Sequence, residues 1–297
     1  MTELLVLHIA KREILAVSLD DSSVRTVVTD VDETPDGIVV DQARGHIYWT
    51  NMGVPDPESG RGAFSTFFTR NGSVERVNLD GSDRQTIVSR GAFTTGKQLT
   101  ADFDAGLLYW CDREGMQVLR CRLDGSGLET LVVAGTDAQD PRNHCVGIAV
   151  DRVNKLIYWT QKGAPDAGEG RIFRCGTEIP AGQTATDRRD IELLWQDLPE
   201  PIDLDLDNSQ NLVWTDRGAE PDGNTLNRGR VQPEVGAYEI LSRGYQEAIG
   251  LATPDYTTYY VSELRSGGIR VVNLANGSDR ELAQLGPGVT GIALVES

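Results

Sequence analysis

The feature that most constrains this fold is a short hairpin pattern at residues 36–51 that returns four more times along the chain. Each copy consists of two apolar runs joined by a polar turn with Asp, Asn or Gly, which is the pattern of a β-hairpin. The further copies cover residues 102–112, 147–161, 202–216 and 250–262. A central aromatic residue recurs in every copy, namely Trp49, Trp110, Trp159, Trp214 and, as the expected equivalent, Tyr260. Their intervals of 61, 49, 55 and 46 residues indicate a propeller or a solenoid.

A second hairpin follows the first one in most repeats. It covers residues 17–28, 77–88, 121–132 and 272–283, where a strand ends in Leu and turns, mostly through Asp-Gly or Asn-Gly, into another strand. These dipeptides accept the positive φ angles of tight hairpins. Each repeat therefore predicts four strands, here lettered a to d from the innermost outward, and radially arranged four-stranded sheets are propeller blades.

The two ends of the chain are expected to complete one blade together. Residues 4–9, 13–19 and 24–29 supply strands b, c and d without a preceding strand a, whereas residues 289–296 match the strand a pattern of residues 147–151. With the five internal repeats, this predicts an all-β fold with six four-stranded antiparallel blades, forming a single domain over residues 1–297. Closing the ring also removes the free sheet edges of a linear array.

Composition narrows the possible partners. The chain has 28 basic and 45 acidic residues, a formal net charge of −17, and such a surface disfavours nucleic acids and anionic membranes. No apolar run is long enough to span a bilayer. The four cysteines are expected to be free thiols, because the pair Cys111 and Cys121 falls out of register across its hairpin and Cys121 and Cys175 occupy equivalent packing positions. Free thiols favour a cytoplasmic setting.

These repeats resemble the YWTD β-propeller family, known from lipoprotein-receptor ectodomains, and the resemblance spans nearly the whole chain. The last motif position varies, being occupied by Asn51, Asp112, Gln161, Asp216 and, as we expect, Ser262. In the family an acidic residue here helps to tie neighbouring blades together, so its replacement leaves the bracing network uncertain. The cysteine-rich modules that flank the receptor propellers do not occur in this sequence.

A site is expected where the b–c and d–a loops open around one end of the central channel. The b–c loops are expanded at residues 52–70, 162–170 and 217–226, and insertions on one face of a repeat array are typical of a binding face. The first insertion holds Phe64, Phe67 and Phe68, and Phe93 follows in a d–a loop. These aromatic residues fit either an apolar lid over a small-molecule pocket or a small core of the loop itself.

The d–a loops supply the polar candidates. Lys97, Arg142 and His144 are predicted as catalytic groups, because donors aimed into an apolar mouth stabilise negative charge on an oxygen and His144 can also carry a proton. Taken singly, each also fits a solvated charge or a structural hydrogen bond. The predicted substrate-binding residues are Phe64, Phe67, Phe68, Phe93, Gln98, Tyr245 and Glu247. We expect no cofactor and no metal.

Compact propellers of this kind are also known from fungal biosynthetic clusters, where they act as hetero-Diels–Alderases that join a tropolone-derived quinone methide to a sesquiterpene. This chain is similar to them in size and in its aromatic-rich loop, which implies a cofactor-independent enzyme with a small apolar substrate. Two alternatives remain open. One is a protein-binding propeller that uses the same face, and the other is a calcium-dependent lactonase-like hydrolase with Asp36, Glu200, Asp203 and Glu247 as the suitably placed oxygen ligands.

Overall fold

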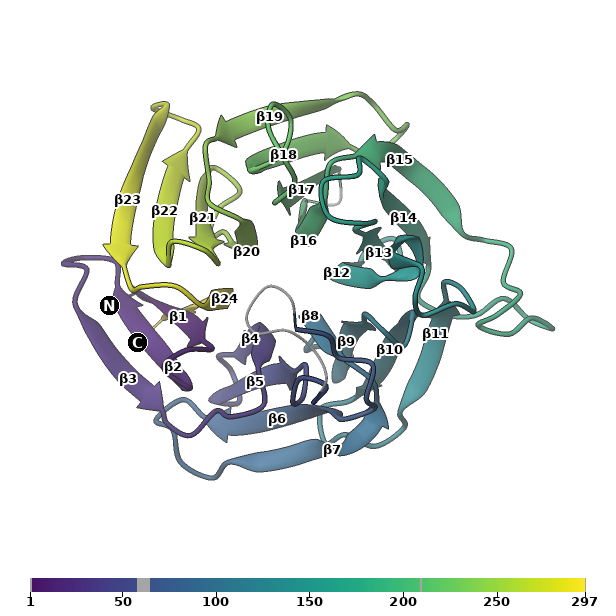
Figure 1. Cartoon of the computed structure of the whole chain (residues 1–297), viewed down its shortest axis with the longest axis horizontal. Coiled ribbons are helices and arrows are strands. Elements are labelled where there is room, and N and C mark those ends of the chain that lie inside the picture. The colour runs from purple at the N-terminus through teal and green to yellow at the C-terminus, as the bar shows by residue number, and fades with distance from the viewer. Residues whose placement is uncertain (1, 58–64, 209, 297) are drawn as a thin grey trace.

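The computed structural model describes residues 2–57, 65–208 and 210–296, which form six four-stranded antiparallel sheets arranged radially around a channel (Figure 1). In blade 1 the order from the channel outward is β24 (Val289–Glu296), β1 (Thr2–His8), β2 (Glu13–Ser18) and β3 (Val24–Val28). Blade 2 consists of β4 (Pro35–Asp41), β5 (His46–Asn51), β6 (Gly72–Asn78) and β7 (Gln85–Phe93). Blade 3 consists of β8 (Gly96–Asp102), β9 (Leu107–Asp112), β10 (Gln117–Arg122) and β11 (Glu129–Val133).

The other three blades repeat this order. Blade 4 consists of β12 (Cys145–Asp151), β13 (Leu156–Gln161), β14 (Gly170–Gly176) and β15 (Glu192–Leu198), and a short 3-10 helix η2 (Pro141–Asn143) precedes it. Blade 5 consists of β16 (Pro201–Asp207), β17 (Asn211–Asp216), β18 (Thr225–Arg230) and β19 (Tyr238–Arg243). Blade 6 consists of β20 (Ala248–Ala252), β21 (Thr258–Glu263), β22 (Gly268–Asn273) and β23 (Ser278–Gln284).

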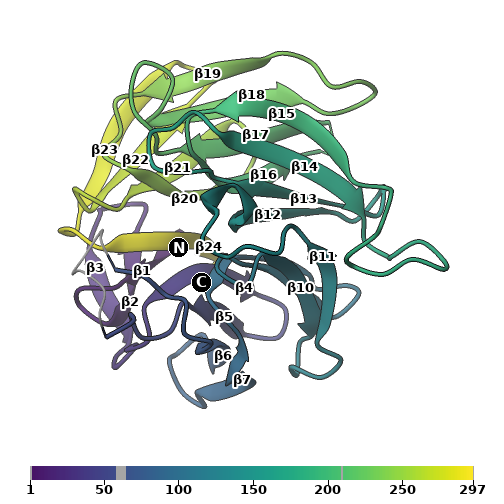
Figure 2. The ribbon, with the colours of Figure 1, turned by 45° about the vertical axis from the view of Figure 1, so that its right-hand side comes forward.

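The predicted ring closure is confirmed. Strand β24 pairs antiparallel with β1, with Val6 opposite Ile292 and Leu4 opposite Leu294, and the two strands lie side by side in both ribbon views (Figures 1 and 2). Because the last strand of the chain is the innermost strand of the first blade, the chain ends hold the ring shut. Each inner strand also contacts the inner strand of the next blade around the whole circuit.

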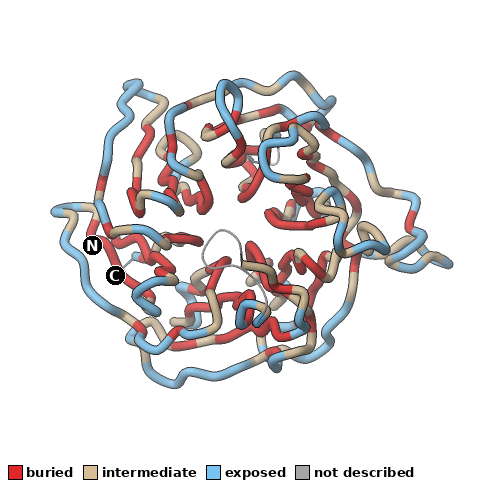
Figure 3. Tube along the Cα trace, in the orientation of Figure 1, coloured by how far each residue is buried: buried red, intermediate tan, exposed pale blue. Residues whose placement is uncertain are grey.

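The Tyr-Trp pair of the motif follows from how blades pack. Successive side chains of a strand point to opposite faces of the sheet, so Trp110 packs toward blade 2 with Val74 and Leu99, whereas Tyr109 packs toward blade 4 with Ile148 and Ile157. The same alternation recurs around the ring and divides the core into one apolar layer per blade interface. Figure 3 accordingly shows the inner strands as mostly buried and the outermost strands as mostly exposed.

One sequence alignment was wrong by a residue. Leu251 pairs with Val261, and in blade 2 the equivalent residue Ile38 pairs with Trp49. Val261 is therefore the counterpart of the tryptophans, and Tyr260 is the counterpart of the motif tyrosines. The last motif position of blade 6 is consequently Glu263 instead of Ser262. A shift of one residue moves a side chain to the other face of a strand, which is why this detail matters for packing.

The hydroxyl position of the motif ties the blades together. The inner strands of blades 2–6 lose regular pairing between their first and fourth residues. In blade 5 the Thr215 hydroxyl accepts the free Asp203 N–H (3.1 Å) and donates to the Ile249 carbonyl of blade 6 (2.6 Å). From the same position of their blades, the hydroxyls of Thr50, Thr160 and Ser262 and the thiol of Cys111 donate to the next inner strand. In blade 1 the donor is Thr290 of the inner strand itself, which binds the Pro35 carbonyl (2.9 Å), so all six blade interfaces carry a side-chain bond of this kind.

The acidic position has a different role from the one that the resemblance implies. Asp112 accepts the N–H groups of Thr94 and Thr95 (2.9 and 2.7 Å) and of Gly115 (3.0 Å), and Asp216 binds Glu200 N–H and Gly218 N–H in the same manner. These carboxylates fix the loops that lead into their own blades.

The four cysteines are buried and free, as predicted. In the described part of the chain no helix is long and apolar enough to cross a bilayer.

Candidate functional site

One face of the channel is framed by six equivalent residues, each of which follows the second strand of its blade. Their backbone N–H groups donate to the residue that precedes the inner strand, at 2.8–3.4 Å. We call this set the mouth ring, and its members are Ile9, Met52, Arg113, Lys162, Arg217 and Leu264. Three consecutive blades thus place a basic residue at this position, and the other three place an apolar one.

The basic half of the mouth ring forms buried ion pairs. Arg113 binds Glu114 (2.7 Å), whereas Lys162 (3.1 Å) and Arg217 (2.7 Å) bind the same carboxylate, that of Glu200. The side chains of Lys162 and Glu200 are 8% and 4% exposed. Breaking a buried pair leaves an uncompensated charge, at a cost of roughly 3–5 kcal/mol, so these contacts hold the charged groups in fixed positions.

Lys97 joins this layer from the start of β8. Its ammonium group binds the Asp36 carboxylate and lies 3.8 Å from the Met52 sulfur. Burial lowers the pKa of Lys97, and the Asp36 carboxylate partly opposes that shift. Burial also lowers the pKa of Lys162 to about 8, opposed by Glu200 and reinforced by the charge of Arg217. Four basic side chains and the carboxylates that bind them thus lie together at this face.

The three predicted catalytic residues do not converge. His144 is buried near the charged layer, where its Nε2 lies 2.8 Å from the Ala138 carbonyl and burial lowers its pKa. Arg142, in contrast, is exposed on η2 and is paired with Asp140 (2.8 Å). The side chain of Lys97 is engaged by Asp36. Lys97 and His144 thus both lie at this charged face, each with a different partner, whereas Arg142 does not.

The predicted phenylalanine wall is also divided. Phe67 lies at this face, since its carbonyl accepts the Thr95 hydroxyl (2.8 Å) and the Arg113 guanidinium lies 5.7 Å from its ring centre. Phe68 is half-buried. Phe93 is the last residue of β7 and packs at 5.3 Å against Trp110 in the blade 2–3 core, so its predicted place at the mouth is wrong. Phe64 lies outside the described residues.

The two candidates from the loop between β19 and β20 lie on the other side of the ring. Tyr245 belongs to the blade 5–6 core, with the Arg270 guanidinium 4.1 Å from its ring centre, and burial raises its pKa. Glu247 is half-buried, has a φ of 60° and donates its N–H to the Asn224 side chain (2.8 Å). Lys97 belongs to blade 3, so Tyr245 does not complete a cluster with it.

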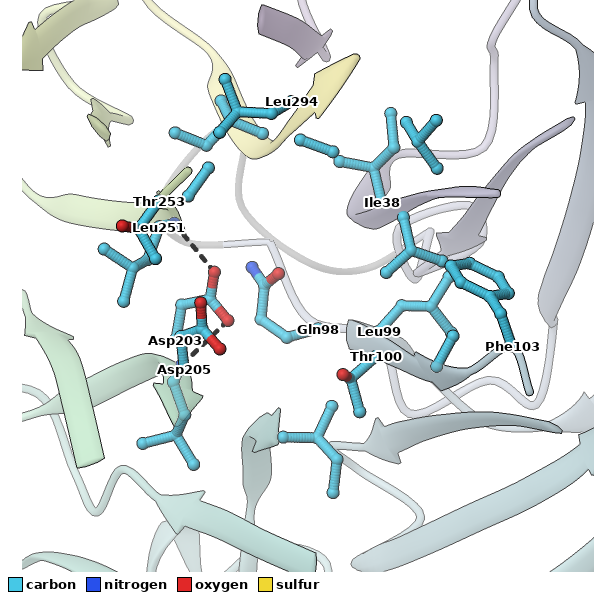
Figure 4. Close-up of a pocket in the computed structure, with 18 of the residues that line it drawn as sticks. Ile38, Gln98, Leu99, Thr100, Phe103, Asp203, Asp205, Leu251, Thr253 and Leu294 are labelled. Atoms are coloured by element: carbon cyan, nitrogen blue, oxygen red, sulfur yellow. Dashed lines mark hydrogen bonds between the residues drawn. The ribbon is translucent and has the colours of Figure 1, made fainter. Parts of the chain in front are cut away.

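The opposite part of the channel contains a cavity of about 380 Å³, which we call the channel cavity (Figure 4). It is lined by the middle and far ends of the inner strands and by Phe103 and Arg152 in the a–b turns. The fourth residue of every inner strand contributes to its apolar wall, namely Ile38, Leu99, Ile148, Leu204, Leu251 and Ile292. The cavity thus lies toward the a–b turns, whereas the sequence pointed to the b–c loops.

Two polar side chains enter the channel cavity where other blades have glycine. The third inner-strand residue is glycine in four blades, and a Cβ on Gly147 would lie 1.9 Å from the Ile202 carbonyl oxygen. Blades 3 and 5 instead carry Gln98 and Asp203, which point toward one another in Figure 4. Gln98 was predicted from its loop, but Asp203 was considered only as a calcium ligand. The sequence signal for Asp203 is that it stands at a position where four other blades have glycine.

The environment of Asp203 favours its protonated form. The side chain accepts the N–H groups of Leu204 and Leu251 (both 2.9 Å), but it has no cation partner among the contacts of the described residues. Burial raises the pKa of Asp203 well above its ordinary value, against the effect of those two donors. The half-buried Asp205 also lines the cavity, and burial raises its pKa to about 6.

A metal site finds little support in these contacts. Within residues 2–57, 65–208 and 210–296, no three His, Cys, Asp or Glu side chains are grouped so that they could hold an ion. Asp36 is bound to Lys97 and Gln98, and Glu200 to Lys162 and Arg217. The calcium-dependent alternative therefore has no ligand set in the described part of the chain.

The architecture and the channel define a six-bladed β-propeller with a cavity among its inner strands. Comparison with known proteins gives the family. The chain is 41% identical over 300 residues to low-density lipoprotein receptor-related protein 1 of Pyricularia oryzae, covering 95% of this chain and 92% of that protein. It belongs to the YWTD-type six-bladed β-propeller family of the low-density lipoprotein receptor. No family model matches the sequence.

More distant relatives agree with this assignment. The 3-hydroxyacyl-CoA dehydrogenase-like protein LAM1 of Cochliobolus heterostrophus is 37% identical over 97% of this chain, which spans 61% of that protein. Mouse low-density lipoprotein receptor-related protein 5 is 33% identical over 52% of this chain. Among solved structures, a chain of the nidogen/laminin complex superposes with a TM-score of 0.74 at 19% identity, covering 99% of this chain and 98% of that one. That likeness shows the fold alone.

Proposed function

We propose that this propeller is a cofactor-independent enzyme that binds an apolar natural-product intermediate in the channel cavity. The reaction to which it is most similar is the hetero-Diels–Alder addition of a tropolone-derived quinone methide to a sesquiterpene. A small apolar substrate and a cytoplasmic setting are part of this proposal. The observation that carries it is a channel cavity that combines a ring of apolar inner-strand side chains with hydrogen-bonding side chains.

The cavity suits such a ligand in size. Small-molecule sites typically measure about 300–1,000 Å³, and the channel cavity has about 380 Å³. Ile38, Leu251 and Ile292 supply apolar surface from separate blades. Two reactants held in contact there react as if at much higher concentration.

The polar groups would act on the oxygen of the heterodiene. A protonated Asp203 keeps its two backbone donors and adds an O–H donor, which would polarise that oxygen as the new bonds form. Gln98 would donate its second amide N–H, because its Nε2 is oriented by the Asp36 carboxylate (3.2 Å). Lys97, bound to Asp36, would then be a positioning residue and not a direct donor.

The test uses the purified chain with a quinone-methide precursor and a humulene-type sesquiterpene, with adduct formation followed by chromatography. Asp203→Ala removes the donor and is expected to lower kcat by about 10²-fold, the usual effect of losing an oxyanion donor. Ala252→Phe fills the cavity and is expected to abolish turnover. The matched control is Asp20→Ala, because Asp20 is exposed in the turn between β2 and β3 and lies outside the cavity lining.

Three outcomes would overturn the proposal. The first is that no adduct forms with the wild-type chain and that neither reactant raises its melting temperature. The second is capture of one stoichiometric protein partner, which would favour the protein-binding alternative. The third is loss of thermal stability in chelator, which would favour a calcium-dependent hydrolase.

A further inference from the structure

The mouth ring has two chemically distinct halves. Blades 3, 4 and 5 contribute Arg113, Lys162 and Arg217, and blades 6, 1 and 2 contribute Leu264, Ile9 and Met52. The apolar half continues inward at Leu264, which packs on the apolar cluster of Val146, Ile202 and Ile249. One face of the channel is therefore cationic on one side and apolar on the other.

The cationic half carries more positive than negative charge in its ion pairs. Arg113 has its own carboxylate in Glu114, but Lys162 and Arg217 share Glu200. The Lys97–Asp36 pair beside them is balanced. These ion pairs comprise four cations and three carboxylates, and the carboxylates of Asp112 and Asp216 lie beside them, bound to backbone N–H groups of the same loops. The pKa of Lys162 is lowered to about 8 chiefly by burial, and the charges of Arg217 and Arg113 add to that effect.

The two arginines are the accessible members of this half. The Arg217 side chain is 22% exposed and that of Arg113 is 14% exposed, whereas Lys162 is 8% exposed. A ligand approaching from this face would therefore meet guanidinium groups first. Guanidinium binds a carboxylate through two parallel N–H donors, with geometric specificity that an ammonium group lacks.

We propose that the mouth ring binds the carboxylate of an amphipathic organic acid. The carboxylate lies against Arg113 and Arg217, and the apolar body lies toward Ile9 and Leu264, which are half-buried, beside the buried Met52. The two guanidinium groups favour a carboxylate, and the apolar half of the ring favours an organic acid over an inorganic anion. This site lies at the opposite end of the channel from the channel cavity and does not rest on the proposed reaction.

The test measures binding of decanoate to the full chain by isothermal titration calorimetry below its micelle concentration. Decanol, which lacks the charge, and inorganic phosphate, which lacks the apolar body, are the comparison probes. Decanoate is expected to bind at least about tenfold more tightly than either, since a hydrogen bond to a charged group contributes about 1.5–3 kcal/mol. Equal binding of decanol or of phosphate would overturn the amphipathic site.

Two variants separate recognition from folding. Arg217→Gln removes the more exposed of the two cations that share Glu200 and is expected to weaken decanoate binding at least about tenfold. Glu114→Gln frees Arg113, which cannot lose its proton, and is expected to tighten binding, a change that damage to the fold would not produce. Arg228→Gln is the matched control, because Arg228 pairs with Glu239 (2.7 Å) on the outer part of blade 5.

The cavity variant distinguishes this site from the proposed reaction. Ala252→Phe is expected to abolish turnover but to leave decanoate binding unchanged. If Ala252→Phe abolishes decanoate binding and Arg217→Gln does not, the acid binds in the channel cavity and the mouth-ring site is wrong. If the wild-type chain and Ala252→Phe bind decanoate equally and neither converts the heterodiene, the mouth-ring site stands and the proposed reaction fails.

Discussion

Replacing Thr215 by valine tests the hydroxyl ties that join the blades. The two side chains have nearly the same shape, and Thr215 is fully buried, so the change removes chiefly a hydroxyl group. That hydroxyl donates to the Ile249 carbonyl of the next blade at 2.6 Å and accepts the Asp203 N–H at 3.1 Å. In the valine variant both backbone groups remain buried without these partners.

The magnitude follows from those two groups. A buried polar group left without a partner costs about 1–3 kcal/mol, so Thr215→Val is expected to lower the free energy of unfolding by about 2–4 kcal/mol. With 297 residues at about 2.1 cal/mol/K each, the unfolding entropy is roughly 0.6 kcal/mol/K near the midpoint. The melting temperature should therefore fall by about 3–6 °C.

Differential scanning calorimetry and guanidinium titration would measure this loss. Thr215→Ser retains the hydroxyl and should recover most of it. Thr26→Val is the matched control, because Thr26 is exposed on the outermost strand β3, and a surface change of this kind is usually within about 0.5 kcal/mol. If Thr215→Val costs no more than Thr26→Val, the ties do not stabilise the ring and the reasoning is refuted.

Two further predictions concern the charged face and the inner strands. Between pH 8 and 10.5 the unfolded chain holds a proton that folded Lys162, with its pKa of about 8 against 10.5, has released. The free energy of unfolding should thus rise with pH in this window by about 1.4 kcal/mol per unit from this group. Denaturant titrations of Lys162→Met should lose that share of the rise, while the lowered pKa of Lys97 still contributes in the same direction. Gly147→Ala should destabilise the ring by about 1–3 kcal/mol, because the new Cβ would lie 1.9 Å from the Ile202 carbonyl. Gly236→Ala, whose nearest contact would be 3.6 Å away, should unfold like the wild type.

The family resemblance was readable from the sequence because the repeat itself carries it. Each hairpin shows the near-continuous apolar runs of strands with two buried faces, and the match between residues 289–296 and the internal strand a pattern predicted the closure that Val6 and Ile292 now display. These are local signals repeated at a regular interval. The shift of register at Tyr260 and Val261 arose where the tryptophan was absent and nothing local marked the register.

The candidate site was less accessible to sequence reasoning because its contacts join side chains from different blades. Gln98 is oriented by Asp36, and Glu200 is shared by Lys162 and Arg217. No short-range pattern shows that Lys97 is already paired or that Phe93 continues strand β7 into the core. The repeated basic residue after the second strand was visible in the sequence, but its meaning depended on knowing that these positions form one ring.

The sequence by itself therefore determined the blade, the number of blades and the way the ring closes, because strand alternation and turn chemistry are properties of neighbouring residues. Only the tertiary structure decided which end of the channel is hollow, that Asp203 lines its cavity, and that Lys162 and Arg217 share one carboxylate at the mouth ring. Those features depend on side chains from different blades, and they acquire their chemistry only when packing removes them from water.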